Sequence, residues 1–261
     1  MSEAAAQGAQ QQHRKLSQAE VDVICLRHDR LWSARMGGAR AVFTWKDLSG
    51  LDLTGRNLCD ADFTGAILAD CNLSNARLDN ANLFGADLQN AVLREASLRR
   101  ADLRGACLRG ADLTGADLFE ADLREGTIAA ADRERGLKVY EHSTRASNAQ
   151  GAILAGANLE RSRLSGVMAI KADFSDAVLK DAKLVRANLK QANMSGANMA
   201  GADLSGADLA GADLSDAILV GAKTFAWNVS NANMAGVLTD KPAGQDLASL
   251  PYDDMLRAHA R

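Results

Sequence analysis

Residues 101–125 read ADLRG ACLRG ADLTG ADLFE ADLRE, five units of five residues that each begin with Ala and have Leu at the third place. The same period extends along the chain on both sides of this stretch. Every fifth residue from 48 to 128 is Leu, and the two exceptions among these 17 positions are Phe63 and Ile128. A repeat this regular indicates an architecture in which one small structural unit is used many times.

A second array of the same units extends from residue 154 to about residue 239. Between 172 and 222 the first residue of the unit is Ala eleven times in succession, and the units follow the pattern A(D/N)LxG. In one unit Val167 takes the small position and Ala169 the large one, an exchange that roughly conserves interior volume. Trp227 stands where the pattern requires Ala, so we expect a local distortion there.

A period of five matches neither the 3.6-residue helix nor an uninterrupted two-residue alternation. Within each unit, however, Ala, a polar residue and Leu alternate as in a strand, and the two residues that follow suit a turn. If each unit forms one side of a square, Ala and Leu point inward and four units complete a coil of twenty residues. Coils stacked about 4.8 Å apart would give nine or so coils and a rod of about 40 Å.

These A(D/N)LxG units resemble the pentapeptide-repeat family over about 170 residues. The resemblance implies an all-β fold, a right-handed quadrilateral parallel β-helix. It implies no biochemical activity, because the residues of the motif are the structural ones. Examples of the expected core residues are Phe63, Leu83, Leu103, Leu123, Phe174, Met194 and Leu214.

The composition excludes several classes of function. The formal charge of −3 and the pI near 5.8 argue against direct nucleic-acid binding. No apolar stretch is long enough for a membrane span or a signal peptide, so we expect a cytoplasmic protein. The four cysteines form no CxxC pair and no nucleophile–base cluster is visible, so we expect no metal, no cofactor and no enzymatic activity.

The segment before the repeats is expected to close the solenoid, with a disordered tail at 1–15 and a helix and cap at 16–45. Ser17 and Glu20 form a capping box, and Leu16 and Val21 suit a hydrophobic staple. Apolar residues at helical spacing predict one buried helix face, and two glycines predict the helix end. The face residues are Val21, Ile24, Leu31 and Trp32, and the glycines are Gly37 and Gly38. The segment HDRLWSARMGGARAVF also resembles the lead-in of some pentapeptide arrays, although a partner-binding helix is an alternative.

The two arrays, 46–130 and 151–239, are separated by a charged stretch that predicts a protruding loop at 131–150. The step from Ile128 to Leu154 exceeds five units by a single residue, so the second array restarts out of phase. Insertions in repeat proteins are often binding sites, but a tolerated surface insertion or a seam is an equal alternative. The candidate partner-binding residues are Arg133, Arg135, Lys138, Tyr140 and His142.

The C-terminal tail, residues 240–261, contains the pattern of a short helix that starts near Ser249 and Pro251, with Met255 and Leu256 on its apolar side. Such a helix would cap the last coil. Alternatively, it would join a second copy into a homodimer through this end, as C-terminal segments do in dimeric members of the family.

The distribution of charged residues helps to decide between two possible functions. One is a protein-interaction scaffold or adaptor with an unidentified partner. The alternative is a DNA mimic that engages DNA gyrase, because the quinolone-resistance branch of the family resembles B-DNA. A mimic should be acidic along its length, yet 13 acidic and 8 basic residues give −5 over 48–128, and 8 of each give zero over 152–239. We therefore favour the scaffold.

Overall fold

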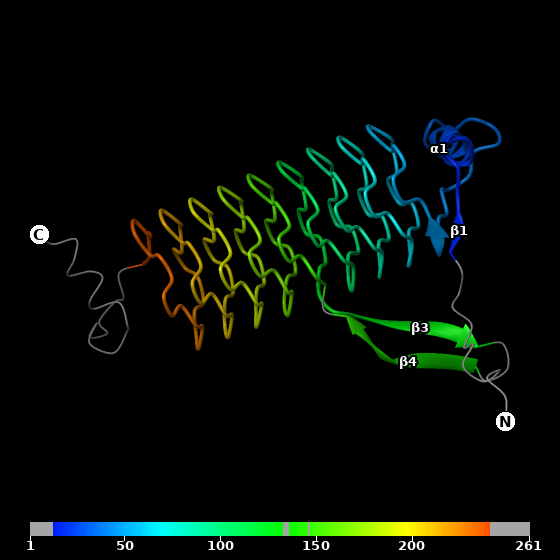
Figure 1. The fold of residues 1–261 in the computed structure, drawn as a ribbon. Coiled ribbons are helices and arrows are strands. Elements are labelled where there is room, and N and C mark those ends of the chain that lie inside the picture. The colour runs from blue at the N-terminus through cyan, green and yellow to red at the C-terminus, as the bar shows by residue number, and fades with distance from the viewer. Residues whose placement is uncertain (1–12, 133–135, 146, 241–261) are drawn as a thin grey trace, which may run out of the picture.

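A computed structural model describes residues 13–132, 136–145 and 147–240. The chain forms a rod of stacked coils, a right-handed quadrilateral parallel β-helix (Figure 1). On one side of the rod, eight parallel bridges connect nine successive residues from Val42 to Lys223, one from each coil. Both arrays therefore belong to one continuous solenoid.

The interior of the solenoid consists of the first and third residues of each unit. Ala101 and Leu103 are at most 1% exposed. The Leu103 N–H donates to Asp122 O of the next coil at 2.8 Å, and the Asp102 N–H donates to Ala81 O of the preceding coil at 3.0 Å. The core examples are all at most 1% exposed: Phe63, Leu83, Leu103, Leu123, Phe174, Met194 and Leu214. Burial of small and large residues in alternation thus stabilises every coil by the same contacts.

The Asp or Asn at the second place of the unit has a structural role in the turn. Asp112 Oδ1 accepts the Thr114 N–H at 3.0 Å, and Asn193 Oδ1 accepts the Ser195 N–H at 3.1 Å. This Asx geometry satisfies an N–H that the ladder leaves unpaired. Since an amide oxygen and a carboxylate oxygen can both accept this bond, the motif allows both residues.

The fifth place of the unit is a corner with positive φ. Gly115 has φ of 66°, and a Cβ there would lie 2.3 Å from the Glu95 carboxylate of the preceding coil. Glycine adopts this conformation without the steric cost that other residues incur. Asn90 adopts it as well, with φ of 55°, which is consistent with the tolerance of Asn for this region.

The N-terminal segment covers the first coil. Strand β1 (Arg14–Lys15) pairs in parallel with β2 (Lys46–Asp47), and helix α1 (Gln18–Trp32) follows directly. Both hydrogen bonds of the Ser17–Glu20 capping box are present. The pairing of β1 corrects the expectation of a disordered tail as far as residue 15.

The face and the end of α1 differ from the sequence prediction. The buried residues are Val21, Cys25 and His28, while Leu31 and Trp32 are each 48% exposed. The helix ends at Trp32, before the two glycines, where Ala34 adopts a positive φ of 51° and the Arg35 N–H donates back to Arg30 O at 2.8 Å. His28 is buried because its Nδ1 accepts the Ala41 N–H at the edge of the first coil, at 3.1 Å.

A β-hairpin interrupts the solenoid after residue 125. Its strands β3 (Gly126–Asp132) and β4 (Gly136–Arg145) are antiparallel. Cys107 pairs with Asn148, whereas the period of an uninterrupted coil would place residue 127 opposite it. The hairpin is therefore inserted within a single coil, which closes with the residues that follow β4.

The position of the insertion differs from the sequence prediction. Ile128 continues the period of five in the sequence, but it belongs to β3. The solenoid resumes by Asn148, which pairs with the coil before the hairpin as well as with Met168 in the coil after it. The excursion therefore spans 126–145 and not 131–150.

Two neighbouring coils have Ala at a large position of the interior. Ala149 and Ala169 lie on the same side of the solenoid, since the Ala149 N–H donates to Met168 O at 2.7 Å. Val167, at the small position beside Ala169, is fully buried. The larger Val thus offsets part of the volume lost at Ala169.

The C-terminal end of the rod is only partly described. Trp227 lies in the last coil and is partly buried. The C-terminal helix and dimer contact expected at 240–261 fall almost wholly outside the described residues. None of the described helices is long and apolar enough to span a membrane.

Candidate functional site: the inserted hairpin

The hairpin is the largest departure from the repeat, and its ladder is irregular. Thr127 pairs with Thr144 and Ala129 with Val139, so β3 has one residue between these pairs where β4 has four, 140–143. Beyond this bulge the pairing is regular to Asp132 and Gly136. Bulges strengthen twist and redirect side chains, and they are frequent at functional positions.

The hairpin leaves the rod at Gly126, which packs tightly against the preceding coil. A Cβ at this position would lie 2.9 Å from Phe84 Cε2 and 3.0 Å from the Arg104 carbonyl group. Only a residue without a side chain allows β3 to leave the solenoid this close to the coil. Figure 1 shows β3 and β4 extending from the middle of the rod toward its N-terminal end.

Polar contacts hold in place the residues around Gly126, where the hairpin leaves the rod. The Arg104 guanidinium forms two hydrogen bonds to Asp102, at 2.8 and 2.6 Å, and lies 5.3 Å from the centre of the Phe84 ring. Where the chain returns, buried Ser147 Oγ lies 2.9 Å from Arg124 O and 3.1 Å from Leu103 O. Both ends of the insertion are thus fastened to the rod.

The structure distributes the predicted loop residues over the hairpin. Lys138 pairs with Ala130 in the regular part of the ladder, and Tyr140 and His142 lie in the bulge. Arg133 and Arg135 fall outside the described residues. Sequence reasoning missed Gly126 and Ser147, although a Gly and a Ser at the edges of an insertion that is out of phase with the repeat were a usable signal.

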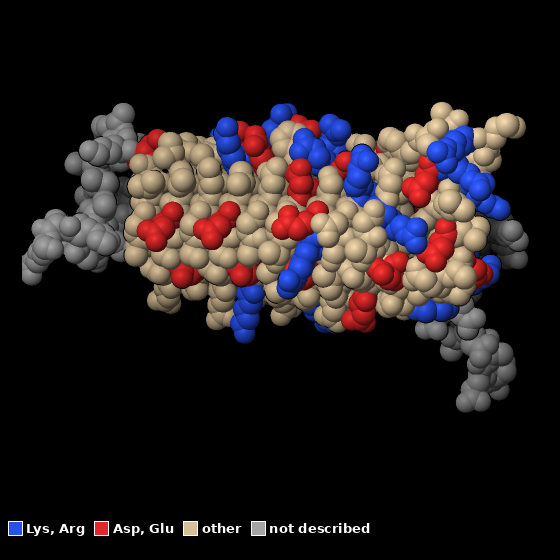
Figure 2. Space-filling model, turned by 90° about the horizontal axis from the view of Figure 1, so that it is seen from above, with Lys and Arg blue, Asp and Glu red and all other residues tan. Residues whose placement is uncertain are grey.

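The faces of the rod have a mixed surface. Five arginines near the middle of the first array bond to acceptors of an adjacent coil or, for Arg104, of their own unit, as in the 2.6 Å pair of Arg99 with Asp117. The other pairs are Arg94–Asp112, Arg100–Asn80, Arg104–Asp102 and Arg109–Gln89. On the face in Figure 2, Lys and Arg are interspersed with Asp and Glu. Arg163, Lys183 and Lys223 lie in one column, with Asp203 between the two lysines.

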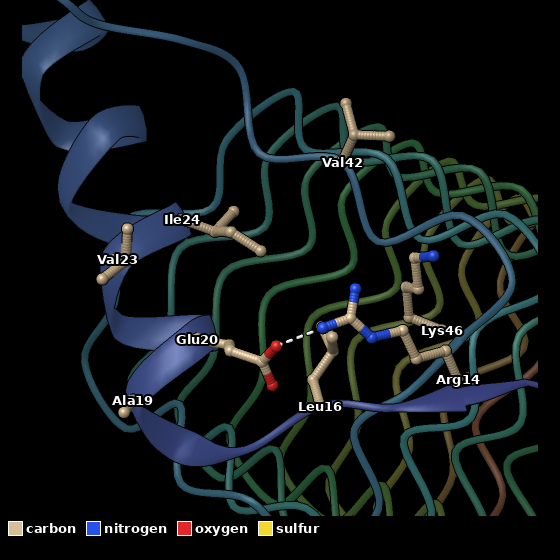
Figure 3. A pocket seen from close by; sticks show the side chains of 8 residues that line it. All are labelled: Arg14, Leu16, Ala19, Glu20, Val23, Ile24, Val42 and Lys46. Atoms are coloured by element: carbon tan, nitrogen blue, oxygen red, sulfur yellow. Dashed lines mark hydrogen bonds and ion pairs between the residues drawn. The ribbon is translucent and has the colours of Figure 1, made fainter.

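A second surface feature is an open groove of about 490 Å³ between α1 and the first coil. Its walls include Leu16, Ile24 and Val42, and the Arg14–Glu20 ion pair lies across it (Figure 3). The lining is mainly apolar, and its titratable side chains are Arg14, Glu20 and Lys46, which include no nucleophile.

The chemistry available at these sites is limited. Within the ranges that the structure describes, no three His, Cys, Asp or Glu side chains are grouped so that they could hold a metal ion. The four cysteines are free thiols. Burial raises the pKa of Cys71 to about 11, and its Sγ donates to Leu48 O at 2.9 Å, so this thiol is a core residue and a poor nucleophile.

The chain matches known proteins in both arrays. A family model described as Pentapeptide repeats matches in eight copies, over residues 47–83, 81–118, 145–181 and 182–221. HetL, a pentapeptide repeat protein involved in heterocyst differentiation regulation in the cyanobacterium Nostoc, is 29% identical. That match covers 84% of this chain and 97% of HetL, with a TM-score of 0.32.

Two further solved structures are similar. A pentapeptide repeat protein from the Arabidopsis thaliana thylakoid lumen is 34% identical, over 44% of this chain and 68% of that one, with a TM-score of 0.30. QnrB1, a plasmid-mediated fluoroquinolone resistance protein, is 18% identical, over 77% and 90%, with a TM-score of 0.28. No curated protein matches the chain. The family matches stop at 118 and resume at 145, so nearly the whole hairpin lies outside them.

Proposed function

Since this chain belongs to the pentapeptide repeat family, we propose that it is a non-enzymatic scaffold or adaptor whose hairpin binds a protein partner. The observation that supports this function is the insertion of β3 and β4 without loss of register: Asn148 still pairs with Cys107 as in an uninterrupted coil. A rigid rod that carries one element outside its repeat can hold that element in a defined position.

The bulge of β4 is the part of the hairpin that we assign to partner contact. Residues 140–143 face a single residue of β3, so they have no residue-for-residue partner in the ladder. They include Tyr140, and aromatic residues of this type are enriched in binding hot spots. The regular ladder on either side would hold the bulge in place.

The test is partner capture with a hairpin-free variant. Deletion of residues 126–146 brings Ser147 next to Glu125 and gives Cys107 and Asn148 the sequence spacing at which Asp102 pairs with Asp122. We expect mass spectrometry of captured proteins to show a partner that binds the full chain and is lost with this deletion. An unchanged set of partners would overturn the proposal.

Point substitutions refine this test. Tyr140→Ala and His142→Ala in the bulge should each weaken capture at least tenfold, the scale of a hot-spot loss of about 1.4 kcal/mol. Thr144→Ala is the matched control, because Thr144 pairs with Thr127 at the base of the ladder. If the control weakened capture as much as the bulge variants, the bulge would not be the contact.

The gyrase alternative has its own test. Because arginines pair with carboxylates around the first array, that surface lacks the uniform negative charge of DNA. We therefore expect no inhibition of purified gyrase and no drug protection at micromolar protein in a supercoiling assay. Inhibition by both the full chain and the hairpin-free variant would replace the scaffold with a DNA mimic that acts through the rod.

A further inference from the structure

Different groups attach the two halves of helix α1 to the first coil. In the first half, the Gln18 amide bonds to the main chain of Asp52. The Arg56 guanidinium adds an ion pair of 2.6 Å with Asp22. In the second half, His28 is the only side chain that forms a hydrogen bond to the coil within the described part of the chain. Apart from apolar contacts, the docking of this half therefore depends on one ring nitrogen.

The ring of His28 fits its site in only one protonation state. It is completely buried, and its Nδ1 accepts the Ala41 N–H at 3.1 Å. The proton of the neutral ring is therefore on Nε2, which forms no hydrogen bond within the ranges that the structure describes. Protonation of Nδ1 would direct a second N–H at the Ala41 N–H. Two donors would then face each other, and a buried positive charge would have no acceptor.

The groups around the ring favour its neutral form. Burial is the largest influence and lowers the pKa of His28 below its ordinary value, and the Arg40 guanidinium acts in the same direction. Three groups raise this pKa by smaller amounts, namely the main chain of Cys59 and the carboxylates of Asp29 and Asp60. The docked ring therefore binds a proton less readily than a ring in water.

The pH dependence of docking follows from this difference. A ring that leaves the site regains an ordinary pKa of about 6.5. Because the released state then binds more protons than the docked state, docking loses stability as the pH falls below this value. The population of the released state grows by a factor of up to about ten per pH unit, until the pH reaches the lowered pKa of the docked ring.

We propose that protonation of His28 releases the second half of α1 from the first coil, so that the N-terminal cap of the rod opens in acid. The contacts of Gln18 and Asp22 keep the first half attached, and the chain rejoins the coil at Ala41. The released segment is therefore tethered at both ends. Its release uncovers the Ala41 N–H at the edge of the coil, and an open edge of this kind can pair with another segment.

The reactivity of Cys25 tests the opening, because this thiol lies on α1 and is completely buried. The probe is 4,4′-dithiodipyridine, which labels thiols in acid as well as at neutral pH, and peptide mass spectrometry measures the labelling rate. Each rate is divided by that of the same thiol in urea at the same pH. Between pH 7.5 and pH 5 we expect the relative rate of Cys25 to rise at least tenfold, with an upper limit of about thirtyfold. Cys71 in the interior of the solenoid should stay protected at both pH values.

His28→Asn separates the titration from the packing. The Asn amide oxygen can accept the Ala41 N–H in place of Nδ1, but it does not titrate. We expect the rate of Cys25 in this variant to be the same at both pH values, even if looser packing makes it faster at both. His13→Gln is the matched control, because His13 is the other histidine of this segment and its Nε2 lies 3.0 Å from Gly65 O. This variant should show the same rise in acid as the parent protein.

Three results would overturn the proposal. The first is a rate of Cys25 that does not change with pH in the parent protein, or that rises equally in His28→Asn. The second is the loss of the rise in His13→Gln, which would assign the titration to His13. The third is labelling of Cys71 in parallel with Cys25, which would show that acid unfolds the rod and not the cap alone.

Discussion

The side-chain amide of Gln18 forms two hydrogen bonds with the main chain of Asp52, donating from Nε2 to the carbonyl and accepting the N–H at Oε1, both at 2.9 Å. In the interior coils the N–H at this place of the unit pairs with a peptide of the preceding coil, as Asp102 does with Ala81. Before the first coil there is no such peptide, and Gln18 supplies an equivalent amide from α1. Helix α1 therefore supplies to the first coil the hydrogen bonds that a preceding coil supplies elsewhere in the rod.

Gln18→Ala should destabilise the protein by about 1 to 2 kcal/mol, because both hydrogen bonds to Asp52 are lost together with the one that Nε2 donates to Asp22. The result is diagnostic because Ala has the higher helix propensity and would otherwise favour α1. Urea unfolding followed by circular dichroism measures the change. Gln150→Ala, an exposed control, should alter stability by less than about 0.5 kcal/mol, and equal effects would contradict the role of Gln18.

Only a deletion of the hairpin that restores the spacing of an uninterrupted coil should leave the protein folded. Removal of residues 126–146 should leave a folded, cooperative protein, because Cys107 and Asn148 then have the spacing of an uninterrupted coil. Removal of 127–146, which is one residue shorter, shifts all later units by one place and turns interior residues outward. Circular dichroism and thermal unfolding of the two variants would reveal the difference. Similar stability of both would mean that the register at Asn148 is not what holds the arrays together.

The larger Val167 should compensate for the interior volume lost at Ala169, so the effects of substitutions at the two positions on stability should be coupled. Val167→Ala leaves two small residues in a fully buried unit and should cost about 2 kcal/mol through the cavity that it creates. Addition of Ala169→Leu restores the ordinary unit and should recover most of that loss. A denaturant titration measures the free energy of unfolding of both variants. A double variant less stable than the single one would show that the two side chains do not fill the same part of the interior.

The cysteines should differ in reactivity. Burial raises the pKa of Cys25 and of Cys71 to about 11, so at pH 8 only about one thiol in a thousand is ionised at either position. Cys107 is partly exposed and should react first with iodoacetamide. Peptide mapping after brief alkylation would identify the labelled residue, with labelling in urea as the control for all four. Early labelling of Cys71 in the native protein would contradict its burial.

Acid should weaken the Asx turns. The Thr54 hydroxyl and N–H donate to Asp52 and hold the pKa of this carboxylate below its ordinary value. A folded pKa below the unfolded one adds stability above the unfolded value, and that stability disappears as pH falls through the folded pKa. Asp52→Asn still accepts the N–H but does not titrate. The urea midpoint of this variant should therefore fall less between pH 6 and pH 3 than that of the parent protein, and an equal fall would exclude Asp52 as a contributor.

The period of five was sufficient to predict the solenoid and its interior, and the spacing of Ser17 and Glu20 predicted the capping box of α1. Each unit makes the same contacts with the units one coil away, so the residues at 101–125 specify their own environment without knowledge of distant segments. The Asp and Asn of the motif, such as Asp112 and Asn193, are structural for the same reason, because an Asx turn is formed within a single unit.

The sequence pattern does not predict which residues pair between stacked coils, or which residues of α1 contact the first coil. Ile128 continues the period in the sequence, yet it lies in β3. The residue that pairs with Cys107 in the next coil is Asn148, and this pairing depends on hydrogen bonds between coils. The buried face of α1 is decided in the same way. The edge of the first coil offers the Ala41 N–H to His28, and this contact turns Leu31 and Trp32 toward solvent. Local repetition defines the rod, whereas the site of the hairpin and the fit of the cap depend on groups that become neighbours only when the coils are stacked.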